Sequence, residues 1–323
     1  MNTNQDQQYL EKLEHIDFQP VFILGLHRSG TSILYKMLTA TECFNPVTAY
    51  HLIKYNQLIH NHVKKQEESC KKKLTEFFRE KGLDDRGIDR LKITADFAEE
   101  YGFLLGQKTF EMYLTSKNLQ LFIEMCKKIQ LISENKKPIL LKNPYDFSNF
   151  LFIKKRFPNA KFVFIHRHPF KTLSSTMKAI RLLFKNKNPY TTQLFRTYNK
   201  IFENPLLLQT LRLCFSQLSA FGIISLSLNT SNATKYYMKN IEKLPKQNYF
   251  SITYEDLCKN PQETMEDIMH SLNIKTSKKI DFTSYVKPRK THLDPSVIQL
   301  RNFIFKCMKK YFERFGYQQE EHI

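Results

Sequence analysis

The sequence predicts an α/β fold with three layers, in which helices flank a central parallel sheet. Four short apolar runs are typical of buried parallel strands, and segments of helical periodicity fill the intervals between them. Strands that alternate with helices favour right-handed crossovers and a sheet that is covered on both faces. The predicted strands are residues 21–24, 139–141, 162–165 and 249–253.

Amphipathic patterns predict the helices around this sheet. The interval between the first two strands is long and mainly helical, so we expect an insertion of about residues 52–137 that caps the sheet and shapes a pocket. With this insertion, residues 1–323 are expected to form a single domain. The predicted helices are residues 30–40, 51–66, 116–134, 146–157, 169–186, 193–227, 261–272 and a closing helix at 293–317.

One stretch is long and apolar enough to raise the question of a membrane span. Residues 205–228 are the most apolar long segment, but Gln209, Arg212 and Gln217 interrupt them. A span needs about 20 consecutive apolar residues. We therefore expect a buried helix here and no transmembrane segment.

The composition is that of a globular protein with a strong positive charge. Charged residues make up 25% of the chain, hydrophobic residues 41%, and the formal net charge is +19. An anionic ligand, a membrane surface or a nucleic acid would suit this charge, although solvated lysine runs explain it equally well. Arginine-rich modules and aromatic RNA-binding patterns are absent from the sequence, so we expect no nucleic-acid partner.

The cysteines and the N-terminus indicate the cellular compartment of the protein. The six cysteines are scattered without a close pair, which argues against a zinc site or a disulfide framework and favours a reducing environment. The polar N-terminus lacks the apolar core of a signal peptide. No cluster of histidine, cysteine and aspartate has the spacing of metal ligands. We expect a cytoplasmic protein without a metal, and the sequence leaves its oligomeric state open.

The first predicted strand leads into a loop that is suited to phosphate. Residues 21–32 read VFILGLHRSGTS, a buried strand followed by glycines, hydroxyls and a cation at the start of a helix. Backbone N–H groups at such a helix start bind anions. Thr31 stands where a Walker A loop has its lysine, and the cation is Arg28 instead. This pattern predicts a nucleotide bound without a metal, and the candidate ligands are Arg28, Ser29, Gly30, Thr31 and Ser32.

Two other strand ends carry cations at the same predicted edge. Lys142 follows the second predicted strand, and Arg167 follows the third, with Ser175 eight residues further on. Ligands in folds of this kind bind at the carboxyl ends of the strands. A guanidinium and a hydroxyl are expected to bind a second phosphate, well away from the first loop. A single cation at a strand end is often merely solvated, but three in order at one edge indicate a site.

These segments together resemble sulfotransferases that use 3′-phosphoadenylyl sulfate (PAPS), and the bacterial and tyrosylprotein-type branch in particular. RSGTS at 28–32 resembles the loop that binds the 5′-phosphosulfate, and Arg167 with Ser175 matches the spacing of the pair that binds the 3′-phosphate. FPNAKF at 157–162 resembles the segment that leads into that strand. YEDL at 254–257 is similar to a segment whose tyrosine, here Tyr254, approaches the adenine. The resemblance covers roughly residues 20–55 and 138–275.

The resemblance implies the P-loop-like, three-layer fold of the family, a reaction and further site residues. A sulfuryl group would pass in line from PAPS, without a metal, to a hydroxyl of a small-molecule or lipid-like acceptor. Lys142 corresponds to the catalytic lysine of the family, and Arg28 and Lys142 would stabilise the charge that develops in the transition state. The resemblance also assigns Arg289 and Lys290 to the 3′-phosphate, although the loop at 287–290 lacks the glycine of the family pattern.

The identity of the general base is left open. The cytosolic steroid and phenol enzymes have a histidine two residues after the lysine, where this chain has Pro144. The tyrosylprotein-like branch has a glutamate about 20 residues beyond the loop arginine, and here His51 occupies that place. A histidine is a suitable base near neutral pH, so His51 is the predicted general base, with capping or packing at the start of its helix as the alternative role. Glu99 and Glu100 are the second candidates.

Two other functions compete with a sulfotransferase. A P-loop nucleotide or small-molecule kinase would need Mg²⁺ and a Walker lysine, and Thr31 argues against it. A basic binding protein with an inactive loop would bind its partner with a steep salt dependence. The acceptor itself cannot be identified, because the aromatic and aliphatic residues of 52–138 and 178–235 suit both a lipid-like ligand and core packing.

Overall fold

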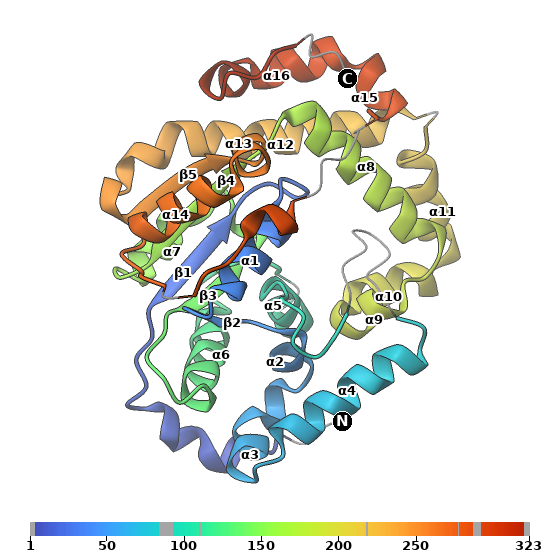
Figure 1. Ribbon diagram of the computed structural model, residues 1–323. Helices are drawn as coiled ribbons and strands as arrows, with labels where there is room; N and C mark the ends of the chain where they lie inside the picture. The colour runs from blue at the N-terminus through green and yellow to red at the C-terminus, as the bar shows by residue number, and fades with distance from the viewer. Residues whose placement is uncertain are drawn as a thin grey trace.

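A five-stranded parallel sheet lies at the centre of the computed structural model, with the strand order β2-β3-β1-β4-β5 (Figure 1). The structure describes residues 4–83, 93–109, 111–217, 219–276, 278–286 and 292–319, apart from the side chain of Arg196. The predicted strands are confirmed, and a two-residue edge strand, β2, is added to them. The strands are β1 (Pro20–Leu24), β2 (Asn45–Pro46), β3 (Ile139–Lys142), β4 (Lys161–His166) and β5 (Tyr249–Thr253).

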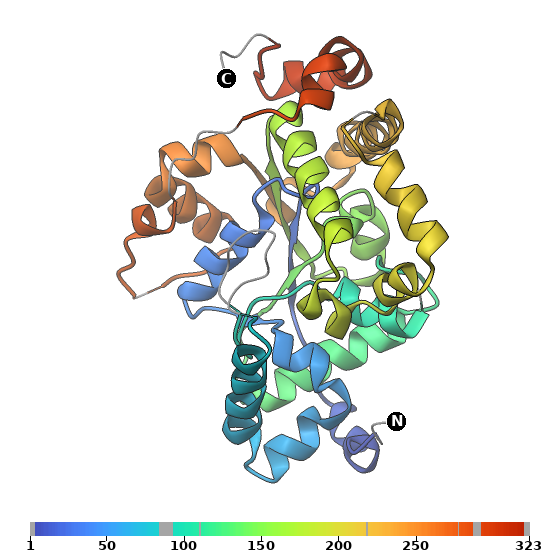
Figure 2. The same cartoon turned by 90° about the vertical axis from the view of Figure 1, so that its right-hand side faces the viewer.

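Alternate residues of the strands build two separate cores, one on each face of the sheet. Phe22 faces a cluster with Phe122 of α6 (Leu119–Ile132) and Phe150 of α7 (Phe150–Arg156). Its neighbour Ile23 faces the other cluster, with Leu34 of α1 (Thr31–Ala40), and α14 (Pro261–Ser271) covers the same face. Because successive side chains of a strand point to opposite faces, apolar residues at every position require helices on both sides. Figure 2 shows the resulting three layers, as the sequence predicts.

Several predicted helices are broken into shorter ones. The segments 51–66, 193–227 and 293–317 are each divided in the structure, so the prediction of single helices there is wrong. Asn188, Asn204 and Asp294 each precede a proline and accept a backbone N–H bond, which starts a new helix at that point. The remaining α-helices are α2 (Ala49–Ile53), α3 (Leu58–Val63), α4 (Glu67–Glu80), α5 (Gly102–Thr109), α8 (Pro169–Lys185), α9 (Pro189–Leu194), α10 (Arg196–Glu203), α11 (Pro205–Cys214), α12 (Ala220–Asn240), α13 (Tyr254–Lys259), α15 (Pro295–Gln299) and α16 (Arg301–Arg314).

The apolar stretch 205–228 is not one buried helix, which corrects the expectation from its hydropathy. It forms α11 and the first part of α12, and Ser219 caps the start of α12. All ten residues of α11 are described, and none of them is buried. The structure exposes 82% of Leu206 and 69% of Leu213. Among the residues that the structure describes, no helix is both long and apolar enough to cross a membrane.

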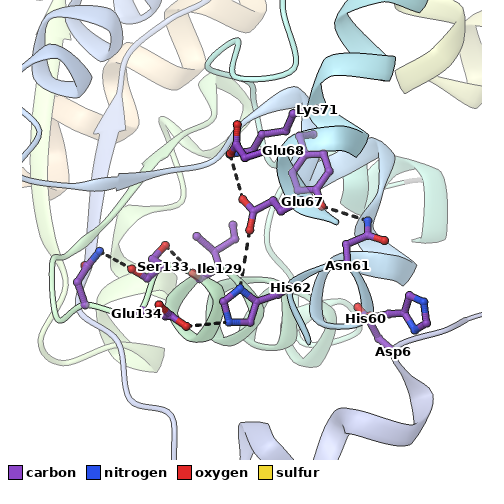
Figure 3. A network of polar contacts seen from close by, with 12 residues as sticks. Asp6, His60, Asn61, His62, Glu67, Glu68, Lys71, Ile129, Ser133 and Glu134 are labelled. Carbon is purple, nitrogen blue, oxygen red and sulfur yellow. Dashed lines mark hydrogen bonds and ion pairs between the residues drawn. The ribbon is translucent and has the colours of Figure 1, made fainter. Parts of the chain in front are cut away.

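Polar contacts tie α3, at the start of the helical insertion, to the N-terminal segment and to the end of α6. The backbone N–H of His60 donates to Asp6 Oδ1 at 2.9 Å, and His62 Nε2 lies 3.1 Å from Glu134 Oε1 (Figure 3). Beside this network, Lys128 Nζ lies 3.0 Å from Asp6 Oδ2, and both side chains are fully buried. A buried charge is tolerated only when it is paired. These contacts therefore fix α3 and the N-terminal segment against α6, which packs on the sheet.

Candidate active site

The loop after β1 has the backbone geometry of an anion site. Arg28 and Gly30 have positive φ angles of 68° and 104°, and the N–H of Ser29 donates to the carbonyl of Leu26 at 3.1 Å. Residues with left-handed backbone geometry turn successive N–H groups toward one point. Gly30 is the N-cap of α1 and provides no side-chain cap. The first N–H groups of α1 are therefore directed toward the space in front of the loop.

Both glycines of this loop are required by close packing. A Cβ atom at Gly25 would lie 2.6 Å from the carbonyl oxygen of Ile165, and one at Gly30 would lie 2.4 Å from Cδ2 of Tyr254. Both distances are far below normal van der Waals contact. The loop therefore runs directly against β4 and against the start of α13.

We predict that Gly30→Ala destabilises the protein more than Gly82→Ala does. Both glycines have positive φ, but a Cβ at Gly82 would meet nothing within 4 Å. The Gly82 variant isolates backbone strain and should lose about 1–2 kcal/mol of unfolding free energy. The Gly30 variant adds the clash with Tyr254 and should lose about 2–4 kcal/mol in urea denaturation. Equal losses would contradict the close packing of the loop on Tyr254.

Arg28, Arg167, Ser175 and Tyr254 come together from three separate segments. Arg28 Nε donates to Ser175 Oγ of α8 at 3.1 Å, and Arg167 Nη1 donates to the carbonyl of Arg28 at 2.9 Å. The Arg167 guanidinium lies over the Tyr254 ring, 4.4 Å from its centroid. The expectation that Arg167 and Ser175 lie well away from the loop is therefore wrong. β1 and β4 are neighbours, so the residues that follow them meet at one edge of the sheet.

Lys142 lies on the other side of the loop, at the end of β3. Its Nζ atom donates to Ser32 Oγ at 3.1 Å and lies 3.3 Å from Glu100 Oε1. The Lys142 side chain is 1% exposed and that of Glu100 is 11% exposed. Lys142 pairs with Ile23 in the parallel register of β1 and β3, which brings it beside the loop. The cation and the carboxylate therefore share one partly desolvated site.

A buried carboxylate holds the segments that carry Lys142 and Glu100. Asp146 accepts hydrogen bonds from Tyr101 Oη at 2.6 Å, from Asn143 Nδ2 at 2.8 Å and from Asn149 Nδ2 at 2.7 Å. Burial raises the pKa of this carboxyl, and the hydrogen bonds oppose that change. Sequence reasoning missed Asp146. Its one local signal is its position just after the proline that ends the Lys142 strand.

His27 packs beside the same site. Its ring lies edge-on to Tyr145, with 4.5 Å between the centroids. Burial lowers the pKa of His27, the carboxylate of Glu100 opposes this, and the cations Arg28 and Lys142 add to it. His27 is therefore a neutral imidazole between these charges at neutral pH.

His51 has the surroundings of a structural residue. The Thr48 N–H donates to His51 Nδ1 at 3.1 Å, which completes a capping box at the start of α2. Burial lowers the pKa of His51 to about 3. Within the described part of the chain, no hydrogen bond or ion pair joins His51 to Arg28 or Lys142. The predicted residues Arg289 and Lys290 lie outside the described residues.

The assembled site is cationic and suited to a polyanion. Arg28, Lys142 and Arg167 contribute three positive charges, and Glu100 places a carboxylate beside Lys142. Within the described residues, Ser29 Oγ and Arg167 Nε are buried without a hydrogen-bond partner, so both remain able to bind a phosphate or sulfate oxygen. The structure contains no group of three or more potential metal ligands among the residues it describes. The arrangement can stabilise negative charge through fixed cations and N–H donors.

Comparison with known proteins relates this site to one family. Residues 20–212 match the model of the sulfotransferase family. The sulfotransferase STF1 from Mycobacterium tuberculosis is similar in structure, with a TM-score of 0.57 and 15% identity over 94% of this chain and 80% of that chain. The sulfotransferase STF9 from Mycobacterium avium has a TM-score of 0.60 and 13% identity over 97% of this chain and 81% of that chain. No curated protein sequence matches the chain significantly.

Proposed function

The chain belongs to the sulfotransferase family, and we propose that this enzyme transfers the sulfuryl group of PAPS to a hydroxyl of a small-molecule or lipid-like acceptor. The observation that carries the proposal is the convergence of Arg28, Lys142 and Arg167 around one loop at the start of α1. PAPS supplies a sulfuryl group on a good phosphate leaving group. The protein therefore needs to bind two phosphates and to stabilise the charge of the transfer.

The donor residues divide into two groups. Arg28, Ser29, Gly30, Thr31 and Ser32 would hold the 5′-phosphosulfate through backbone N–H groups and side chains at the start of α1. Arg167 and Ser175 would hold the 3′-phosphate, and Tyr254 would approach the adenine. The contact of Arg28 with both Ser175 and Arg167 supports two phosphate sites that adjoin each other.

The geometry favours Glu100, not His51, as the general base. Glu100 Oε1 lies 3.3 Å from Lys142 Nζ and so lies beside the cation proposed to stabilise the leaving phosphate. His51 is held by Thr48, and its lowered pKa makes it a weak base. Glu100 would take the proton of the acceptor hydroxyl, while Arg28 and Lys142 stabilise the charge on the transferred group. Glu99 is a poorer candidate, because it is buried and accepts a bond from Tyr190 Oη at 2.6 Å.

The acceptor side is proposed to lie on the helical insertion. Phe78 and Leu104 of the insertion belong to the same apolar cluster as Phe22 of β1, which supports one domain over residues 1–323. Glu100 lies in this insertion of about residues 52–137, so an acceptor hydroxyl would approach from that side. The six cysteines all lie in described segments and are free, which supports a cytoplasmic enzyme.

The direct test is a transfer assay with radiolabelled PAPS and no added metal. Purified protein is incubated with alcohols, phenols, sterols and amines, and the labelled products are separated. We expect the native protein to transfer label to hydroxyl acceptors. A control with chelator-treated protein that has been heat-denatured should transfer none. Transfer to amines alone would contradict the hydroxyl assignment, and phosphate transfer from ATP with Mg²⁺ would favour a kinase.

A further inference from the structure

One region of the surface is unusually apolar. Most of the exposed large hydrophobic side chains within the described residues belong to α8, α11 and α12. Leu206 is 82% exposed, Leu213 69% and Phe221 64%. We call this region the apolar patch, and it comprises Leu182, Leu206, Leu207, Leu213, Phe221 and Leu228. Contiguous exposed apolar residues on a soluble fold mark an interaction surface.

The three helices that carry the patch are held together. Arg212 Nε of α11 donates to the carbonyl of Phe184 in α8 at 2.9 Å, and Arg181 Nε of α8 donates to the carbonyl of Phe215 at 2.6 Å. α12 packs against both α8 and α11. Figures 1 and 2 place α8, α11 and α12 together at the same side of the molecule. The apolar side chains therefore project from a fixed framework.

The same segment is strongly cationic. Residues 171–241 contain ten lysines and arginines and a single acidic residue, Glu203. This segment of less than a quarter of the chain holds about half of the net charge of +19. Lys185, Lys187 and Lys235 are exposed on it. A segment of this charge attracts an anionic surface and repels a cationic one.

Exposed lysines share helical spacing with exposed apolar residues on α8 and α12. On α8, Lys178, Leu182 and Lys185 follow each other at helical spacing and are all exposed. On α12, Phe221, Leu228 and Lys235 follow each other at intervals of seven residues and are all exposed. Apolar anchors flanked by lysines are typical of helices that lie in the interface of an anionic bilayer. A second copy of the chain is a poor fit, because dimerisation would bring two such cationic faces together.

We propose that the apolar patch docks the enzyme on the surface of a bilayer that contains anionic phospholipid. Leu206, Leu213 and Phe221 insert among the acyl chains near the headgroups, while the lysines bind lipid phosphates. The patch does not include the residues assigned to the donor site. Membrane docking and sulfuryl transfer can therefore be tested separately. A negative result for one does not contradict the other.

Vesicle sedimentation tests this docking. The full chain is mixed with vesicles of phosphatidylcholine alone, or of phosphatidylcholine with about one third phosphatidylglycerol, a content that gives a strongly anionic surface. We expect sedimentation with the anionic vesicles only, and its weakening as salt is raised. Leu206→Asp combined with Leu213→Asp should weaken binding at least roughly tenfold. Because both leucines are largely exposed, this variant should keep its thermal stability and its affinity for adenosine 3′,5′-bisphosphate.

A matched control separates the patch from net charge. Val63→Asp combined with Tyr113→Asp makes the same change of charge at residues that are 44% and 46% exposed and belong to other segments. This variant should bind the anionic vesicles nearly as well as the wild type. Equal loss in both double variants, binding to neutral vesicles alone, or no vesicle binding would overturn the proposal. It would also be overturned by a dimer in sedimentation velocity that the Leu206/Leu213 variant abolishes, since a second copy would then cover the patch.

Discussion

Replacement of Lys142 by methionine should lower the rate of sulfuryl transfer by about 10²–10³-fold, the effect typical of removing one fixed stabiliser of transition-state charge. Lys142 Nζ lies between Ser32 Oγ and Glu100 Oε1, and its side chain is 1% exposed. A cation in such a dry position interacts strongly with charge that develops beside it. The bound product, adenosine 3′,5′-bisphosphate, carries the same phosphate in a stable form, so its affinity should fall much less than the rate.

Two further variants show whether this loss is chemical or structural. Lys142→Met leaves the carboxylate of Glu100 without its cation, so the double variant Lys142→Met/Glu100→Gln restores the charge balance. It should unfold at nearly the wild-type temperature and remain inactive. Lys142→Arg keeps the charge but changes its geometry, and it should retain part of the activity. Full activity in Lys142→Met would remove Lys142 from the mechanism.

Glu100→Gln should lower turnover by about 10²–10⁴-fold, the range that general base catalysis contributes. Glutamine retains the size and a hydrogen-bonding oxygen of glutamate, but it cannot take up the proton of the substrate hydroxyl. Removal of a negative charge 3.3 Å from Lys142 Nζ should leave the affinity for adenosine 3′,5′-bisphosphate unchanged or raise it. A purely structural role of Glu100 would instead lower binding and turnover together.

His51→Gln is the paired variant that distinguishes the two candidate bases. His51 has a pKa lowered to about 3 by burial, so it stays neutral at ordinary assay pH and cannot cause an inflection of the rate near neutrality. Its variant should lose part of the capping of α2, typically about 1 kcal/mol of stability, and should keep the wild-type dependence of kcat on pH. Loss of turnover in His51→Gln with full activity in Glu100→Gln would reverse the assignment.

The sheet and the donor loop could be predicted from the sequence because local signals determine them. Continuous apolar runs define β1, β3 and β4, and the glycine and hydroxyl pattern at 25–32 defines the loop. The parallel register then brings Lys142 and Arg167 to the loop, although they lie 110 or more residues further along the chain than Ser32. The two-residue β2 gave no such signal, because two residues cannot display a periodicity.

Other features depended on tertiary packing that the sequence does not display. The bond from Arg28 to Ser175 joins residues 147 positions apart, so spacing alone could not place them together. Asp146 has no motif, and its role follows from the three donors that surround it. The exposure of Leu206 contradicts its hydropathy, because residue type alone does not show which apolar segment lies in the outer layer.

The most direct test of the donor site is calorimetric binding of adenosine 3′,5′-bisphosphate without metal, beside ATP with Mg²⁺, to the wild type and to Arg167→Ala. Arg167 donates to the loop at Arg28 and stacks on Tyr254, and its Nε is free to bind a phosphate oxygen. We predict metal-free binding of the bisphosphate that weakens roughly tenfold to a hundredfold in Arg167→Ala, as expected for the loss of charge-assisted hydrogen bonds. Preference for ATP with Mg²⁺, or equal binding by both proteins, would contradict the donor site described here.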